Sequence, residues 1–257
     1  MTLHSRLSAA IAFICLFIFA TAVQGAELKI LCANGMQTVM DDLGPKFERS
    51  TGHKLAVTFD TGGSTIKRAR GEMGDVVIAI REGVAALAKD GRAAPDTMVA
   101  IASTGISVAV RKGAPKPDIA SPEALKRVLL SAKSITYLNP ADGGASGIHF
   151  AKVLDRLGIS NEMTPKTIYA PKAPAVGAMV ANGEAELGVL QYQLLYGVPG
   201  IEIIGPLPGD LQSTTVFSVA VMTSSLNAEA AKDLINFLRT AEAAAVIKAK
   251  GMDPISR

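Results

Sequence analysis

Residues 27–66 read ELKILCANGMQTVMDDLGPKFERSTGHKLAVTFDTGGSTI, and this stretch decides the fold. An apolar run at 28–33 ends in the turn Asn34-Gly35, and the apolar residues that follow are spaced as in an amphipathic helix. A second run, at 55–59, leads into the glycine turn DTGGST and a basic helical segment. Strand, turn and helix thus occur twice in succession, which predicts βα units and a largely parallel sheet.

The rest of the chain repeats this scheme. Strands are predicted at 75–80 and 134–138, a loop and helix at 144–158, and a helix, turn and strand at 176–190. A final helical stretch should run from Asn227 to Ala249. In the helix at 144–158, the residues expected on the buried face are Ile148, Ala151, Leu154 and Leu157.

Two segments, 105–113 and 214–222, alternate apolar and polar residues and are expected to carry the chain from one lobe to another and back. We therefore predict an α/β protein with two lobes, two hinge crossovers and a ligand cleft between the lobes. The first lobe should comprise residues 26–105 with a C-terminal return at 218–257, and the second lobe residues 106–217. Each lobe is then close to the usual size of a small domain.

The first residues have the pattern of a cleavable signal peptide. Arg6 precedes an apolar run from about residue 7 to residue 20, and small residues follow. A membrane-spanning helix would need about 20 apolar residues. A lipid-anchored protein would have small residues just before the modified cysteine, whereas Cys15 lies inside the apolar run. We expect removal of residues 1–25 and a mature protein in the periplasm.

The composition argues against several classes of protein. The formal net charge of +3 is close to balance, which disfavours nucleic-acid binding. Cys32 is the only cysteine after the signal peptide, so an internal disulfide is impossible. His53 and His149 have no metal-ligand spacing, and no nucleophile elbow or phosphate loop occurs. We expect a monomeric binding protein rather than an enzyme, without a metal or another cofactor.

Three loops are candidates for ligand binding: 33–37, 60–66 and 139–148. Each follows a predicted strand and opens a predicted helix. Free backbone N–H groups and the helix dipole attract anions there, and glycine permits close approach. Ligands of open α/β sheets gather at these carboxyl ends of strands. Loops from two lobes facing one cleft therefore predict a site for a small anion.

Nearly the whole chain after residue 25 resembles the periplasmic molybdate-binding proteins, which are substrate-binding components of ABC importers with the type II periplasmic-binding fold. Besides residues 27–66, the resemblance rests on GDVVIAI at 74–80, GASGIHFAKVLDRLGI at 144–159, ANGEAELGVLQY at 181–192 and AAKDLINFLRTAEAAAVIKAKGMDP at 230–254. It implies capture of a molybdate-like oxyanion and its delivery to a permease in the inner membrane when the lobes close.

In that family, hydroxyls and backbone amides hold the oxyanion, and this sequence departs from the pattern. The serine usual after the first strand is replaced by Asn34-Gly35, and the serine of the second loop by Gly62 or Gly63. Gln191 replaces a tyrosine. The loop at Ser146-Gly147 matches. The ligand-binding residues that the resemblance implies are Asn34, Gly35, Met36, Gly62, Gly63, Ser64, Arg81, Ser146, Gly147, Gln191 and Tyr192.

These departures leave a second ligand class open. Each missing charged hydrogen bond forfeits about 1.5–3 kcal/mol, although glycine amides still donate. Arg81 follows GDVVIAI, and an arginine grips a carboxylate with two parallel hydrogen bonds. A small organic carboxylate bound through Arg81 is therefore the second candidate ligand. An enzyme or a sensor built on the same fold has no supporting motif in the sequence.

Overall fold

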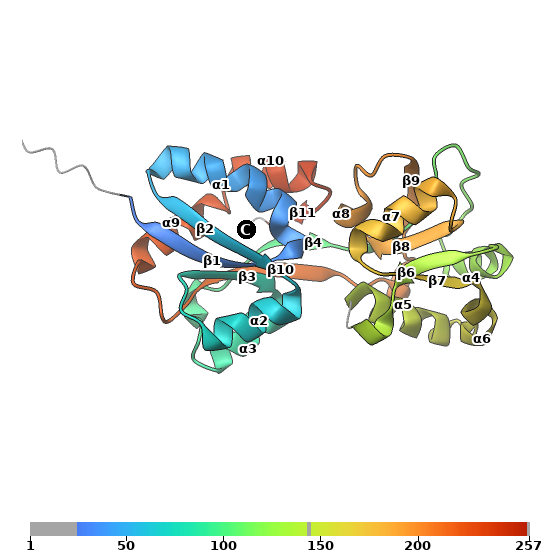
Figure 1. The fold of residues 1–257 in the computed structure, drawn as a ribbon, viewed down its shortest axis with the longest axis horizontal. Helices are drawn as coiled ribbons and strands as arrows, with labels where there is room; N and C mark the ends of the chain where they lie inside the picture. The colour runs from blue at the N-terminus through green and yellow to red at the C-terminus, as the bar shows by residue number, and fades with distance from the viewer. Residues whose placement is uncertain (1–24, 143–144, 256–257) are drawn as a thin grey trace, which may run out of the picture.

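The computed structural model describes residues 25–142 and 145–255, so the predicted signal peptide lies outside the described residues except for Gly25. The strands form two separate sheets, each with helices on both faces (Figure 1). We call each sheet with its helices a lobe. The limits of the lobes given above stay a prediction.

The first lobe contains a six-stranded sheet in the order β11-β4-β10-β3-β1-β2. Helices α1 and α10 lie on one side of this sheet, and α2 and α3 lie on the other (Figure 1). The strands are β1 (Glu27–Ala33), β2 (Lys54–Asp60), β3 (Val76–Ile80), β4 (Val99–Thr104), β10 (Thr215–Val221) and β11 (Asp253–Pro254). The helices are η1 (Asn34–Met36), α1 (Gln37–Thr51), α2 (Gly62–Gly71), α3 (Arg81–Lys89), η2 (Pro95–Thr97), α9 (Ala228–Phe237) and α10 (Ala241–Ala249).

The second lobe contains a five-stranded sheet in the order β7-β6-β8-β5-β9. Its strands are β5 (Ile106–Arg111), β6 (Ile135–Leu138), β7 (Thr167–Ala170), β8 (Leu187–Gln191) and β9 (Ile201–Pro206). Its helices are α4 (Pro122–Ser131), η3 (Pro140–Asp142), α5 (Ala145–Arg156), α6 (Ser160–Met163), η4 (Thr164–Lys166), α7 (Ala173–Asn182), α8 (Tyr192–Leu195) and η5 (Gly209–Leu211). None of the described helices is long and apolar enough to cross a membrane.

The sheets are mixed rather than largely parallel, which corrects the prediction from the sequence. Strand β1 pairs in parallel with β2 and β3, and β6 pairs in parallel with β7 and β8. The strand that follows each crossover runs the other way: β10 is antiparallel to β3 and β4, and β5 is antiparallel to β8 and β9. A strand that carries the chain between lobes enters its new sheet against the direction of the βα strands.

The chain passes between the sheets at two adjacent crossovers. Gly105 alone separates β4 from β5, and residues 207–214 separate β9 from β10. Gln212 joins the crossovers, because its side-chain oxygen accepts from the Ile106 amide at 2.8 Å and its nitrogen donates to the Ile106 carbonyl at 2.9 Å. A Cβ added at Gly105 would lie 2.9 Å from that nitrogen. Glycine therefore leaves room for the Gln212 side chain to make these bonds.

Each buried apolar cluster of the described residues lies within a single lobe. In the first lobe, α1 buries the predicted face, with Val39, Leu43 and Phe47 fully buried, and the helix continues through Pro45. The predicted single helical stretch at the C-terminus is instead two helices, α9 and α10. The break has a local cause, since the Thr240 side chain accepts from the Ala243 amide and starts α10 anew.

Helix α5 buries only part of the predicted face, since Leu154 is buried but Ile148 is not. Phe150 and Val153 are fully buried, whereas Ile148 is 38% exposed. The cause is Gly147, where an added Cβ would lie 2.1 Å from the carbonyl oxygen of Leu138. The helix meets the sheet along its Gly147 side, so the residues one turn after that glycine become the core.

Candidate ligand-binding cleft

A cleft of about 820 Å³ lies between the lobes, at the carboxyl ends of the parallel strands. Ala33 and Ile80 line it where β1 and β3 end, and Gln191 lines it at the end of β8. The starts of α2 and α5 and the second crossover complete the wall. Both lobes therefore contribute to one site, as the sequence predicts for the cleft.

The start of α2 presents open glycines to the cleft. Gly62 and Gly63 line it, and a Cβ added at either would meet nothing within 4 Å. Thr61 caps the helix, because its hydroxyl accepts from the Ser64 amide at 3.3 Å and donates to the Ser64 hydroxyl at 3.0 Å. The helix thus offers unpaired backbone donors and the positive end of its dipole to an anion.

The start of α5 is built differently. Ala145 lines the cleft, whereas Ser146 and Gly147 lie behind it in the wall. The Ser146 hydroxyl is buried and has no hydrogen-bond partner among the described residues. Leaving such a group unsatisfied costs about 1–3 kcal/mol. A ligand oxygen or a water at this helix start would remove that cost.

The first loop divides between cleft and core. Gly35 lines the cleft, Asn34 is exposed outside its lining, and Met36 is fully buried in the first lobe. A Cβ at Gly35 would lie 2.6 Å from the ring of Phe217. Since Phe217 also lines the cleft, this glycine lets the ring form part of the cleft wall.

At the end of β8, the structure brings two glutamines to the cleft. Gln191 is a residue that the sequence predicts for the site, and Gln193 is not. Gln193 is 8% exposed, and its side-chain oxygen accepts from the Thr104 hydroxyl at 2.6 Å. This bond ties α8 to the first crossover and fixes the orientation of the amide. Tyr192, in contrast, does not line the cleft and faces a separate pocket.

The cation in the cleft is Lys67 rather than Arg81. Arg81 begins α3, is exposed, lies outside the cleft lining and has its guanidinium 3.5 Å from Glu82. The charged residues that line the cleft in the described part of the chain are Lys67, Glu82 and Asp142. Lys67 follows Ser64 by three residues and so shares its helix face. From this spacing, Lys67 could have been predicted as a residue of the cleft.

Among the described residues, neither a reactive thiol nor a metal site belongs to the cleft. Cys32 is fully buried in β1, and burial, with a smaller effect of Asp41, raises the pKa of its thiol, so the thiol stays protonated. The described residues contain no group of three or more His, Cys, Asp or Glu side chains placed to hold a metal ion. The cleft therefore offers amides, hydroxyls, one ammonium and two carboxylates.

Comparisons with known proteins agree with this architecture. A family model for a bacterial extracellular solute-binding protein matches residues 28–253. An aconitate isomerase from Pseudomonas sp. is 35% identical over 235 residues, covering 89% of this chain and 88% of that protein. The molybdate-binding protein ModA of Azotobacter vinelandii is 27% identical over 247 residues, covering 91% and 92%.

A solved structure gives the same picture. The substrate binding domain of a putative molybdenum ABC transporter from Clostridium difficile has a TM-score of 0.78 at 19% identity, covering 90% of this chain and 100% of that chain. The predicted type II periplasmic-binding fold and the resemblance to molybdate-binding proteins are thereby confirmed. The names of the relatives give two different molecules: aconitate for the isomerase and molybdate for the binding protein.

Proposed function

Because this chain belongs to the family of bacterial extracellular solute-binding proteins, we propose that it captures a small polycarboxylate between its two lobes. The relatives include molybdate-binding proteins and the substrate binding domain of a putative molybdenum ABC transporter, which supports an ABC permease as the partner. In the proposed role the signal peptide directs the chain to the periplasm, and the loaded protein delivers its ligand to such a permease. The ligand is an anion of the aconitate class rather than molybdate.

The spread of donors over a wide cleft is the observation that carries this proposal. The open amides at Gly62 and Gly63 and the ammonium of Lys67 come from the first lobe, and the amides of Gln191 and Gln193 come from the second. A compact tetrahedral oxyanion needs all of its donors around one small volume. Several carboxylates on a carbon chain suit separated donors, and about 820 Å³ lies within the usual range for organic ligands.

Closure follows from the way the donors are divided. A ligand that reaches both lobes binds the closed arrangement more tightly than the open one and therefore shifts the population toward closure. The crossovers at Gly105 and at residues 207–214 are the segments about which the lobes would turn. The separate apolar cores allow each lobe to move as a unit.

A second candidate function is isomerisation of the same ligand, favoured by the 35% identity to an aconitate isomerase. In aconitate, a base takes a proton from the methylene carbon, the double bond shifts over three carbons, and a proton returns to the former vinylic carbon. This step needs no oxidant or reductant. The carboxylates of Glu82 and Asp142 are the bases that the described cleft offers.

Calorimetric titration of residues 26–257 tests the ligand class. The ligands are trans-aconitate, cis-aconitate, the saturated propane-1,2,3-tricarboxylate, and molybdate. We expect saturable binding of the tricarboxylates and no heat with molybdate. Tight binding of molybdate without any heat from the tricarboxylates would contradict the proposal.

Proton NMR of trans-aconitate in D₂O with the same protein separates binding from isomerisation. An isomerase converts it to cis-aconitate with deuterium on carbon, and Glu82→Gln or Asp142→Asn then abolishes turnover but not binding. A pure binding protein leaves the spectrum unchanged at saturation. Conversion that survives both substitutions would remove these two carboxylates as the base.

A further inference from the structure

A second pocket, of about 670 Å³, lies on the opposite side of the crossovers from the cleft. Figure 1 places α10 and β11 on one side of the crossovers and α2 and α5 on the other. The two cavities share a single lining residue, Thr214 in the second crossover. This hinge pocket is therefore distinct from the cleft, although both lobes line it.

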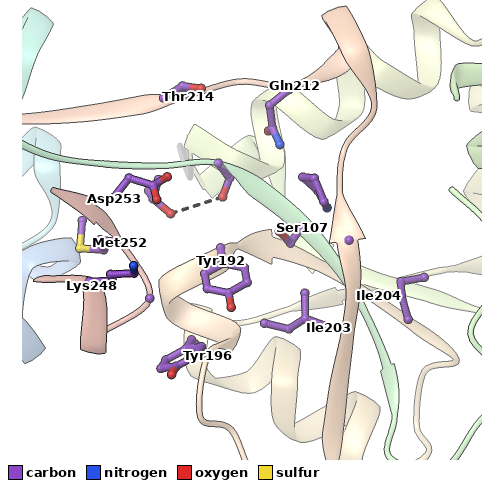
Figure 2. A pocket seen from close by; sticks show the side chains of 15 residues that line it. Ser107, Tyr192, Tyr196, Ile203, Ile204, Gln212, Thr214, Lys248, Met252 and Asp253 are labelled. Carbon is purple, nitrogen blue, oxygen red and sulfur yellow. Dashed lines mark hydrogen bonds between the residues drawn. The ribbon is translucent and has the colours of Figure 1, made fainter. Parts of the chain in front are cut away.

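The first lobe contributes both charges of the hinge pocket. Lys248 comes from α10 and Asp253 from β11, and Figure 2 shows both side chains reaching into the pocket from the same wall. Neither forms an ion pair within 4.0 Å in the described part of the chain. One wall thus offers an ammonium and a carboxylate that no described residue of opposite charge neutralises.

The second lobe contributes an apolar and aromatic wall. The rings of Tyr192 and Tyr196 are stacked with their centroids 5.6 Å apart, and the Ile203 side chain lies on the same side of β9 as these rings (Figure 2). At the edge of the pocket the lobes touch, because a Cβ added at Gly251 would lie 2.8 Å from Tyr196. The pocket therefore sets two opposite charges against a surface suited to an aliphatic or aromatic group.

We propose that the hinge pocket binds a free amino acid with an aliphatic or aromatic side chain. Lys248 pairs with its carboxylate, Asp253 pairs with its ammonium group, and its side chain packs on Tyr192 and Ile203. A ligand with only one charge would form only one of these two charge-assisted contacts. This site goes beyond the proposed function, because it takes another ligand in another cavity.

The position of the site gives it a regulatory consequence. An amino acid held between Lys248 in the first lobe and Tyr192 in the second fixes the separation of the lobes on this side of the crossovers. Closing the cleft requires the lobes to turn about the same crossovers. Occupancy of the hinge pocket and ligand binding in the cleft are therefore coupled, and the coupling is reciprocal.

Direct calorimetric titration tests the proposal without any cleft ligand. L-leucine and L-phenylalanine are titrated into residues 26–257, beside two analogues of leucine: 3-methylbutylamine, which lacks the carboxylate, and 4-methylpentanoate, which lacks the ammonium group. We expect one amino acid per chain and at least tenfold weaker binding of each analogue. Lys248→Met and Asp253→Asn, both at exposed positions, should each weaken leucine binding at least tenfold.

Lys67→Met, in the cleft, is the matched control and should leave leucine binding unchanged. The proposal is overturned if neither amino acid gives a binding signal at a concentration tenfold above a dissociation constant of about 1 mM. It is also overturned if the singly charged analogues bind as well as leucine. It is also overturned if Lys67→Met abolishes the binding while Lys248→Met does not, because leucine would then occupy the cleft. Thermal unfolding of each variant shows that it is folded.

Discussion

Helices α2 and α5 both begin at the cleft and have glycine in their first turn, α2 in the first lobe and α5 in the second. Gly62 and Gly63 at the start of α2 have open space beside them, whereas Gly147 at the start of α5 touches the carbonyl of Leu138. The first pair leaves room for a ligand. The second glycine lets a helix approach a strand. A glycine turn at a helix start therefore identifies a ligand loop only when the space beside the glycine is known.

The largest expected effect of this difference is on stability. Gly147→Ala places a Cβ 2.1 Å from a backbone oxygen, which cannot move cheaply, so we expect a loss of about 3 kcal/mol in the free energy of unfolding. Gly62→Ala, the matched control, should change it by less than about 1 kcal/mol. Urea unfolding of both variants measures the two values. Equal effects would mean that the two helix starts are built alike.

The next effect concerns the charge that the first lobe brings to the cleft. Lys67→Met should weaken trans-aconitate binding by about 1.5–3 kcal/mol, because a charge-assisted hydrogen bond is lost. Arg81→Met, at the exposed start of α3, should change the affinity by less than about 0.5 kcal/mol. Calorimetry of both variants separates the two cations. A large loss at Arg81 with none at Lys67 would restore the carboxylate site at Arg81 that the sequence suggested.

The smallest effect concerns the hydroxyl of the second lobe. Ser146→Ala should weaken ligand binding by about 1 kcal/mol if this buried hydroxyl reaches the ligand. Ser218→Ala is the matched control, since Ser218 also has a buried hydroxyl without a partner among the described residues but lies in the middle of β10 rather than at a helix start. It should leave the affinity unchanged. Identical affinities of both variants and the wild type would assign Ser146 to packing alone.

The sequence predicted the fold well because its main signals are local. The apolar run and glycine turn of residues 27–66 specify β1, α1, β2 and the start of α2 without knowledge of the rest. Strand direction was predicted less well, because it depends on where the chain enters a sheet after each crossover. The burial of Phe150 and Val153 in α5 was missed for a similar reason, since the contact of Gly147 with Leu138 joins two elements.

The candidate site could be predicted only in part. The turns at Gly35 and Gly62 were found because they follow strands, and Gln191 was implied by the resemblance to the molybdate-binding proteins; all three residues line the cleft. Gln193 could not be found in this way, because its role depends on a hydrogen bond to Thr104 in the first crossover. Arg81 shows the converse: a residue directly after a strand end can begin a helix and still lie outside the cleft lining.

Small-angle scattering of residues 26–257 with and without trans-aconitate tests most directly whether a polycarboxylate bridges the two lobes. We expect a smaller radius of gyration at saturation, because the ligand contacts both lobes and favours closure. Lys67→Met should need a higher ligand concentration to reach the same compaction. An unchanged radius of gyration while calorimetry shows full occupancy would contradict the proposal that the ligand bridges the two lobes.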